Sequence, residues 1–422
     1  MLSLILEKHP LWCSPSSGGG VACYYYYDEV TWIVVGLALL WLLLYLVRRY
    51  RRARALRRPS RRANYRLLRR VVRIKRELSE RYLRPGFSAN IHAVGIGLLD
   101  GTDQYCIQVF VNDADQELWP GAGAAGLPGQ FRGVPLVLIE MPVAAFLTDA
   151  APSPLAASSQ YPKGIRERQE VIVGGISGAN TNLTGQSGTI GYFCTRKSRW
   201  TRRREVHLLS NSHVFADLRK ARADAGDLIM QPSPGEPASN RPIATLVNFS
   251  ALKFDSDPKE PNHIDAAIAK LWAQQQHKAV IPLIGTVKGY VPKKEIEVGE
   301  AVRKFGRTTG YTEGRIFSIY LDIWILYDRV GQSAFFQNQI LIEPASPQPA
   351  RFVAKGDSGS LLVDAEQHAV GLIFGGMSEA SSRMERVVRI DPATNQPRRV
   401  EGYGVANPIS EVLHRLKIDL LV

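Results

Sequence analysis

The longest uninterrupted apolar stretch of the chain lies near its N-terminus. Residues 30–47 read VTWIVVGLALLWLLLYLV, which is 18 residues without a charge. A membrane-spanning helix needs roughly 17–25 such residues, and aromatic side chains at both ends of the run suit the membrane interface. The pattern therefore predicts a transmembrane helix over residues 30–47, preceded by an extracytoplasmic segment over residues 1–29.

A strongly basic segment follows this apolar run. Residues 48–76 contain 15 Lys and Arg and no acidic residue. Positive charge gathers on the cytoplasmic side of membrane helices, whereas a signal peptide carries its charge before the apolar run. The charge bias therefore predicts a single-pass membrane protein with its N-terminus outside and everything after Arg48 in the cytoplasm.

Apolar positions return at helical spacing within the basic region. Leu68, Val72 and Leu78 fall on one helical face. They predict an amphipathic helix over residues 64–83, within a basic juxtamembrane segment that spans residues 48–84. Such a helix suits an anionic lipid surface or a second copy of the chain, so membrane lipid is an expected partner and a homo-oligomer is an open alternative. A solvated spacer is the other interpretation.

A small domain is predicted over residues 85–150, either α/β or β. Strands are expected over residues 91–98, 105–111 and 134–140. The dipeptide Asp100-Gly101 is a hairpin turn signal between the first two. The Ala-, Ser- and Pro-rich composition that follows predicts a linker. The linker and the strand that enters the next domain together cover residues 151–184.

Short apolar runs separated by turn residues continue to the C-terminus. One set covers residues 189–195, 205–210, 227–231, 243–249 and 264–271, and a second covers residues 301–305, 315–319, 335–342, 360–363, 370–374 and 403–409. This spacing is typical of antiparallel sandwiches and barrels. We therefore predict a mainly β fold with two antiparallel β-barrels, about 185–285 and 286–422, and a short helix over residues 410–418.

Composition changes this picture little. The formal net charge of +14 resembles that of a nucleic-acid-binding protein, but residues 48–76 account for it. Outside them, 38 of the 53 basic residues remain against 39 acidic ones. A specific nucleic-acid partner is therefore not expected.

The four cysteines divide between the two parts of the chain. Cys13 and Cys23 precede the apolar run, where they form either a disulfide or two thiols. Cys106 and Cys194 lie in predicted strands, and we expect them to be reduced core residues.

Candidate chemistry centres on Ser358, in the stretch Gly-Asp-Ser-Gly-Ser. A serine becomes a nucleophile when a base lies within hydrogen-bond reach and a carboxylate orients that base. His213 ends an apolar strand 52 residues before Asp265, and Asp265 lies in an aliphatic run 93 residues before Ser358. A buried Asp needs hydrogen-bond partners, and an imidazole N–H is a suitable one.

The glycines beside the serine have a separate predicted function. Gly356 lets its own N–H and that of Ser358 converge, and such an oxyanion hole stabilises an acyl-transfer intermediate by about 3–4 kcal/mol for each donor. Gly359 allows a second chain segment to approach closely behind the nucleophile.

Three blocks in this order resemble the histidine, aspartate and serine blocks of the chymotrypsin/trypsin-like serine proteases. They are Ser-Asn-Ser-His-Val, His-Ile-Asp-Ala-Ala and Gly-Asp-Ser-Gly-Ser. The unit over residues 91–140 resembles the N-terminal domain of a bacterial branch and, more distantly, of plant narrow-leaf-type proteases. The resemblance implies two barrels of chymotrypsin type, with a triad of His213, Asp265 and Ser358 in the cleft between them.

Two departures from this family matter. In many secreted relatives the acid that precedes the serine, here Asp357, pairs with an N-terminus freed by cleavage before Ile-Val-Gly-Gly. The chain contains Val171-Ile-Val-Gly-Gly175, but no basic residue stands at the cleaved position. A strand and turn is the preferred interpretation, and the partner of Asp357 stays open.

The second departure concerns the specificity pocket that the resemblance implies. The residues expected to line it are Ile373, Phe374, Gly375 and Gly376. Phe374 stands where many relatives place a small hydroxyl residue that supports the aspartate.

These patterns together predict a membrane-anchored serine endopeptidase that hydrolyses protein or peptide substrates through an acyl-enzyme. No metal or organic cofactor is implied. The alternative is a catalytically inactive, protease-like scaffold recruited to the membrane.

Overall fold

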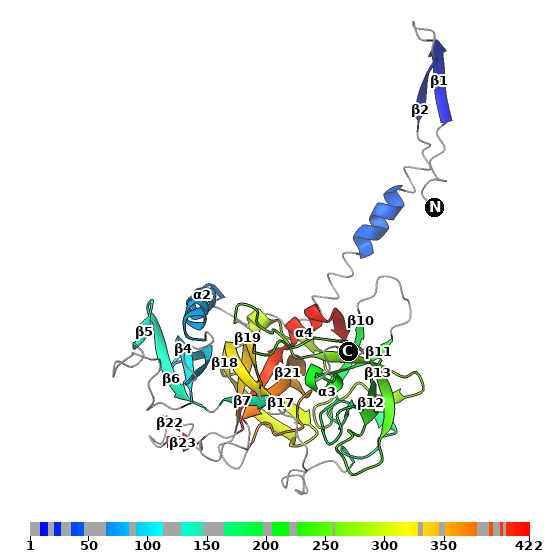
Figure 1. Ribbon diagram of the computed structural model, residues 1–422. Helices are drawn as coiled ribbons and strands as arrows, with labels where there is room; N and C mark the ends of the chain where they lie inside the picture. Colours follow the sequence, from blue (N-terminus) through cyan, green and yellow to red (C-terminus); the bar gives the residue numbers. More distant parts are fainter. Residues whose placement is uncertain are drawn as a thin grey trace. The chain divides into compact units, whose positions relative to one another are not determined.

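The protein is described from a computed structural model (Figure 1). The structure describes residues 9–15, 21–26, 35–45, 65–83, 90–112, 128–141, 143–146, 164–196, 205–218, 226–255, 258–327, 332–345, 351–377, 388–390, 397–399 and 402–422. The chain divides into two compact units, Met1–Arg57 and Arg58–Val422.

The first unit contains a β-hairpin and a short helix. Strands β1 (His9–Pro15) and β2 (Val21–Tyr26) pair antiparallel, with Cys13 opposite Cys23 in the register. The choice between a disulfide and two thiols stays open. Residues 35–45 form the helix.

The predicted transmembrane helix over residues 30–47 is not supported. Within this range the structure describes the helix over residues 35–45. Across the described ranges, every helix is too short or too polar to cross a membrane. This finding contradicts the predicted single-pass localisation, with the N-terminus outside and the catalytic domain cytoplasmic.

The first sheet of the second unit contains the strands of the predicted first set. Its order is β25-β10-β11-β14-β13-β12-β9, and all neighbours run antiparallel. The strands are β9 (Ala179–Asn180), β10 (Tyr192–Arg196), β11 (Val206–Ser210), β12 (Leu228–Gln231), β13 (Arg241–Phe249), β14 (Ala267–Leu271) and β25 (Ile418–Leu420). The last strand returns from the C-terminus after helix α4 (Ile409–Arg415), which packs on β21.

The second set forms a closed ring of six antiparallel strands. The ring order is β17-β20-β21-β24-β19-β18, and β18 pairs back to β17. The strands are β17 (Ala301–Gly306), β18 (Gly310–Tyr327), β19 (Gln332–Pro344), β20 (Leu361–Asp364), β21 (His368–Met377) and β24 (Gly404–Pro408). A closed ring leaves no free edge within its paired length.

Four strands of residues 85–150 extend this second sheet. They continue outward from β18 in the order β3 (Ile91–Leu98), β4 (Tyr105–Val111), β6 (Val134–Glu140) and β5 (Gln130–Phe131). A fifth, β7 (Ala144–Phe146), pairs with both β18 and β21. The remaining short elements are β8 (Val171–Ile172), α3 (Ser212–Phe215), β15 (Gln276–His277), β16 (Gly289–Tyr290), the 3₁₀ turn η3 (Lys293–Glu295), β22 (Val388–Ile390) and β23 (Pro397–Arg399).

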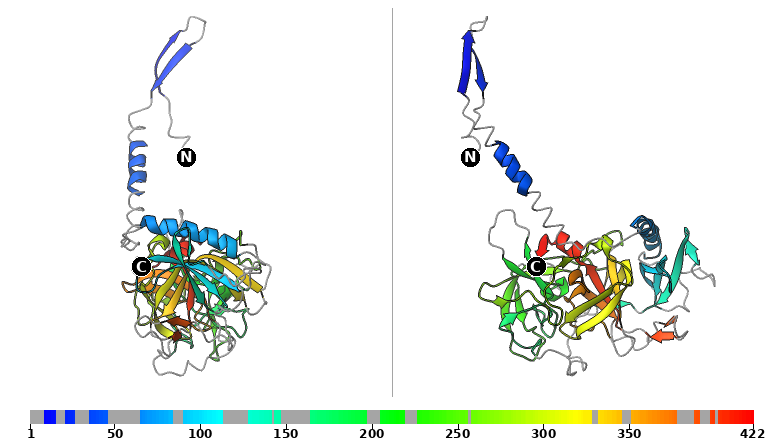
Figure 2. Two further views of the ribbon diagram at one scale, coloured as in Figure 1. Left: turned by 90° about the vertical axis from the view of Figure 1, so that its left-hand side faces the viewer. Right: turned by 180° about the vertical axis from the view of Figure 1, so that it is seen from behind.

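Helix α2 (Tyr65–Tyr82) confirms the predicted amphipathic helix, but its apolar face packs inside the protein. Its apolar side packs on β3 and β4 (Figure 2), where these side chains are buried: Leu68, Val71, Ile74, Leu78 and Tyr82. Lys75 also turns inward, and its Nζ lies 2.7 Å from a carboxylate oxygen of Asp322 on β18. The apolar face expected to meet lipid or a second copy is therefore covered by the protein's own sheet.

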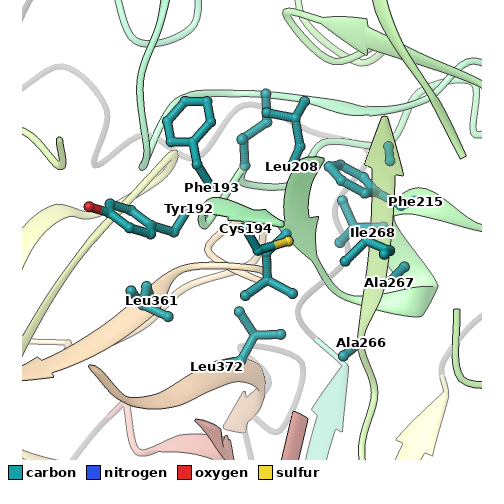
Figure 3. Packing of buried hydrophobic residues seen from close by; sticks show 14 of the residues in the cluster. Tyr192, Phe193, Cys194, Leu208, Phe215, Ala266, Ala267, Ile268, Leu361 and Leu372 are labelled. Carbon is teal, nitrogen blue, oxygen red and sulfur yellow. The ribbon is translucent and has the colours of Figure 1, made fainter. Parts of the chain in front are cut away.

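The two sheets share one apolar core. Figure 3 shows Tyr192, Cys194 and Leu208 of the first sheet gathered with Leu361 and Leu372 of the second. Because both sheets contribute to a single cluster, the loops that connect their strands are held at a fixed relative position. Cys106 and Cys194 are buried free thiols, as expected, and burial raises the pKa of Cys106 to about 12.

Removing the Leu78 side chain tests whether α2 belongs to the folded core. We expect Leu78→Ala to lower the free energy of unfolding by about 2–5 kcal/mol, because a buried leucine leaves a cavity. Urea denaturation measures the change. Leu67→Ala is the matched control, since Leu67 is 40% exposed whereas Leu78 is 0% exposed. Equal small effects of both variants would show that α2 does not pack as described.

Candidate active site

His213 is positioned by an abrupt turn at the end of β11. The strand stops at Ser210, and the single helical turn α3 begins at Ser212 after Asn211. The Asn211 side-chain amide donates to the carbonyl of Asp265 at 2.7 Å. This bond ties the turn to the segment that precedes β14, and His213 is buried there.

Asp265 lies beside His213, as the sequence predicted, and is 0% exposed. Its Oδ2 is hydrogen-bonded to the His213 Nδ1. Its Oδ1 accepts the backbone N–H of Ser212 at 2.7 Å and that of His213 at 3.2 Å. Three hydrogen bonds therefore satisfy the buried carboxylate, and they fix which ring nitrogen of the histidine faces it.

Asn407 is part of this arrangement and was missed in the sequence. Its Oδ1 accepts the backbone N–H of Asp265 at 2.9 Å, and its Nδ2 donates to Gln339 Oε1 at 2.7 Å. Both amides are 0% exposed. The only local signal was an isolated asparagine in an apolar strand, because such a residue needs buried hydrogen-bond partners. Asn407 thus joins the aspartate to β24 and β19 of the second sheet.

Ser358 lies where the two sheets meet. Its carbonyl accepts the N–H of Thr189 at 2.8 Å, and its Oγ donates to the carbonyl of Phe374 at 3.3 Å. A Cβ added to Gly359 would lie 2.1 Å from the Thr189 carbonyl oxygen and 2.3 Å from the Ser210 Oγ. We call this contact of residues 356–359 with residues 189–191 and Ser210 the seam.

The seam brings the nucleophile loop to the strand that carries the histidine. Ser210 is the last residue of β11, three positions before His213. Gly359 has φ +96°, a left-handed conformation that favours glycine, and it also has no room for a side chain. The prediction that Gly359 permits a close approach is therefore confirmed. The contact of the Ser358 hydroxyl with the imidazole stays a prediction.

Gly356 occupies a similarly restricted position. Its φ is +96°, and an added Cβ would lie 2.4 Å from the Thr308 Oγ1. Its carbonyl accepts the Thr189 hydroxyl at 2.8 Å. The backbone of the nucleophile loop is thus held from both sides, while the assignment of the Gly356 and Ser358 N–H groups to an oxyanion hole stays a prediction.

Asp357 finds its partner in Lys304 of β17, which the sequence left open. The Lys304 Nζ lies 3.1 Å from the Asp357 Oδ2, and both side chains are 0% exposed. Oδ2 also accepts the Thr309 hydroxyl at 2.6 Å, and Oδ1 accepts the N–H groups of Thr308 at 2.8 Å and Thr309 at 3.1 Å. An internal ammonium group therefore balances this carboxylate, and no newly freed N-terminus is required.

The electrostatics of this pair follow from its burial. Desolvation alone would raise the pKa of Asp357, but Lys304 and the hydrogen bonds from Thr309 and the backbone hold it below its usual value. Desolvation lowers the pKa of Lys304, and the charge of Asp357 opposes that change. The Ile-Val-Gly-Gly stretch forms the end of β8 and the turn after it, which is the strand and turn that the sequence predicted.

The residues predicted to line the specificity pocket all lie at the end of β21. Ile373 accepts the N–H of Gly359 at 2.9 Å through its carbonyl, and the carbonyl of Phe374 accepts the Ser358 hydroxyl. The Phe374 ring packs on Phe336, with centroids 4.7 Å apart. Gly375 and Gly376 follow and are buried. Ile373 and Phe374 therefore contact the Ser358 loop, while the assignment of all four residues to a pocket stays a prediction. Asp265 obtains its support from backbone N–H groups and not from residue 374.

No protein-family model matches the sequence, and no curated protein matches it. Solved structures do match. Protease A of Thermobifida fusca is 15% identical, with a TM-score of 0.35, 60% of this chain and 99% of that chain covered. A glutamic acid specific serine protease is 14% identical, with a TM-score of 0.38 and coverage of 59% and 100%. Cellulomonas bogoriensis chymotrypsin is 16% identical, with a TM-score of 0.35 and coverage of 59% and 98%.

The chain resembles chymotrypsin-like bacterial serine proteases, as the three sequence blocks predicted. At this level of similarity the matches say nothing of substrate or mechanism, which must be argued from the chain's own residues. Within the residues that the structure describes, no group of three or more His, Cys, Asp or Glu side chains is arranged to hold a metal ion.

Replacing Lys304 by Met tests the buried pair. We expect Lys304→Met to cost about 3–5 kcal/mol of unfolding free energy at pH 7, because it leaves a buried carboxylate without its cation. The double variant with Asp357→Asn should recover part of this loss. Lys270→Met is the control: it removes an exposed ion pair with Glu205, worth about 0–1 kcal/mol.

The unfolding free energies of the wild type and of Lys304→Met should depend on pH in opposite directions. In the wild type the pKa of Asp357 is depressed, so its contribution to stability is present above the unfolded pKa of about 3.9 and is lost as the pH falls through the folded value. In Lys304→Met burial raises that pKa, so the cost of the substitution should shrink as the carboxyl becomes protonated near pH 4. A cost that is the same at pH 7 and pH 4 would contradict an ion pair.

Proposed function

We propose that the protein is a serine endopeptidase, with Ser358 as nucleophile, His213 as general base and Asp265 as the group that orients the imidazole. The observation that carries this proposal is the buried His213–Asp265 pair beside the seam, because the seam holds the Ser358 loop against the end of β11. A base oriented by a carboxylate beside a serine on a rigid loop is the arrangement that activates an alcohol.

The reaction begins when His213 Nε2 takes the proton from the Ser358 Oγ. The Oγ attacks a peptide carbonyl carbon, and the carbonyl oxygen becomes an oxyanion that the N–H groups of Gly356 and Ser358 receive. His213 then gives its proton to the departing amine as the C–N bond breaks. A water molecule, activated by the same imidazole, hydrolyses the acyl-enzyme and releases the carboxylic acid product.

Asp265 has a positioning role in this scheme. With its Oδ2 on the His213 Nδ1, the carboxylate leaves Nε2 as the basic nitrogen and stabilises the imidazolium that forms. Phe374 favours the inactive scaffold, because many relatives have at this position a hydroxyl residue that supports the aspartate. The backbone N–H groups of Ser212 and His213 supply that support here, and Asn407 accepts the backbone N–H of Asp265.

The substrates that fit this proposal are proteins or peptides, bound where the two sheets meet as in two barrels of chymotrypsin type. Ile373, Phe374, Gly375 and Gly376 are the proposed walls of the pocket for the residue before the cut. Their approach to Ser358 through the Phe374 carbonyl supports this assignment.

Substitution of Ser358 tests the proposal. We expect Ser358→Ala to abolish covalent labelling by a fluorophosphonate and to abolish peptide hydrolysis, because the attacking oxygen is gone. Ser360→Ala is the matched control in the same motif: its hydroxyl only contacts the Asp357 carbonyl, so labelling should persist. Asp265→Asn should lower kcat about 10⁴-fold by favouring the wrong imidazole tautomer. Wild-type protein that folds but is never labelled would instead indicate the scaffold.

A further inference from the structure

Strand β7 lies against the end of β21, next to the nucleophile. It pairs antiparallel with β21 in a register that sets Phe146 opposite Gly375, Ala145 opposite Gly376 and Ala144 opposite Met377. Ala145 also pairs in parallel with Leu326 of β18. This short strand therefore links two strands that are not neighbours in the ring order, β18 and β21 (Figure 1).

The pairing partners show which edge of β21 is filled. Leu372 pairs with Asn407 of β24 and with Leu361 of β20, so these two strands lie on opposite edges. Gly375 pairs with Val405 of β24 as well as with Phe146. A strand has two edges only, and β7 must therefore lie on the same edge as β20.

The nucleophile stands on that same edge, between β20 and β7. Gly359, which leads into β20, donates its N–H to the carbonyl of Ile373, and Ser358 donates its hydroxyl to the carbonyl of Phe374. The next residue, Gly375, is the first that pairs with β7. Along this edge of β21, the pairing positions beside Ser358 are therefore those that β7 fills.

The direction of β7 is that of a substrate. From Ala144 to Phe146 the chain runs past Met377, Gly376 and Gly375, and so toward Ser358. An extended peptide that adds itself to the edge of β21 and presents a carbonyl to Ser358 must run the same way, using the same backbone groups. The carbonyl of Ala145 lies 3.3 Å from the site of a Cβ on Gly375, so glycine there allows the close approach.

We infer that β7 occupies the strand position of a polypeptide substrate, and that the protease is autoinhibited toward extended substrates until β7 leaves the edge of β21. This inference rests on the proposed function. It also limits the inhibition to ligands that need the edge: a small reagent that reaches Ser358 alone does not compete with β7.

The experiment compares two readouts on the full chain: the labelling rate with a small fluorophosphonate and the hydrolysis rate of fluorescein-labelled casein. Ala145→Pro removes an N–H from the paired strand and cannot pair on both edges. We expect casein hydrolysis to rise about fivefold to tenfold, while labelling stays within about twofold. Ala273→Pro is the control, because Ala273 is exposed at the second position of a turn that proline suits.

A second variant decides the matter if Ala145→Pro does not fold. The cysteine pair Ala145→Cys with Leu326→Cys locks β7 to β18 by a disulfide between paired residues. The oxidised protein should lose casein hydrolysis, keep its labelling and regain hydrolysis on reduction. If labelling persists but neither variant changes casein hydrolysis, β7 is a structural strand and the inference is wrong. If the wild type is not labelled at all, the proposed function itself fails.

Discussion

The structure depends on one close contact, the seam at which the backbone of residues 356–359 presses on residues 189–191. Thr189 donates its N–H to the Ser358 carbonyl and its hydroxyl to the Gly356 carbonyl, so two bonds from one residue just before β10 hold a loop of the second sheet. The approach is equally close on both sides: an added Cβ would lie 2.1 Å from the Gly359 carbonyl oxygen at Gly191 and 2.1 Å from the Thr189 carbonyl oxygen at Gly359. Because backbone atoms of both segments make this contact, side-chain rotation cannot change the distance between the sheets.

A buried charge network holds the other side of the same loop. Asp357 accepts hydrogen bonds from the hairpin between β17 and β18, and Lys304 balances its charge. A carboxylate at this depth is tolerated because each oxygen has several donors, which offsets the loss of hydration. The nucleophile loop is therefore clamped between the seam and this network without any event at the N-terminus of the domain, which accounts for a Val-Ile-Val-Gly-Gly stretch that serves as an ordinary strand and turn.

Much of this could be predicted from the sequence, and the failures have a common cause. Alternation and turn residues locate the strands of both sheets, and the blocks around His213 and Asp265 identify a pair that does meet. Lys304 and Asn407 were missed as partners because they act across 53 and 142 residues, and local spacing does not predict such contacts. The membrane span over residues 30–47 was predicted from hydropathy and charge alone, and these describe which environment a segment tolerates, not whether it forms a spanning helix.

The long strand β18 links the remaining parts of the molecule. Along its length it pairs with β17 and β19, then with β3, and near its end with β7. Lys75 of α2 reaches Asp322 in the middle of the same strand, and Ser318 donates to the Ile96 carbonyl at 3.2 Å. The helix and strands that precede the protease fold are thus attached to the strand that also borders the occupied edge of β21. A displacement of these elements would act on β7 directly, because β7 follows β6 after three residues and shares β18 with β3. The chain order itself therefore couples the N-terminal strands to the edge of β21 beside Ser358.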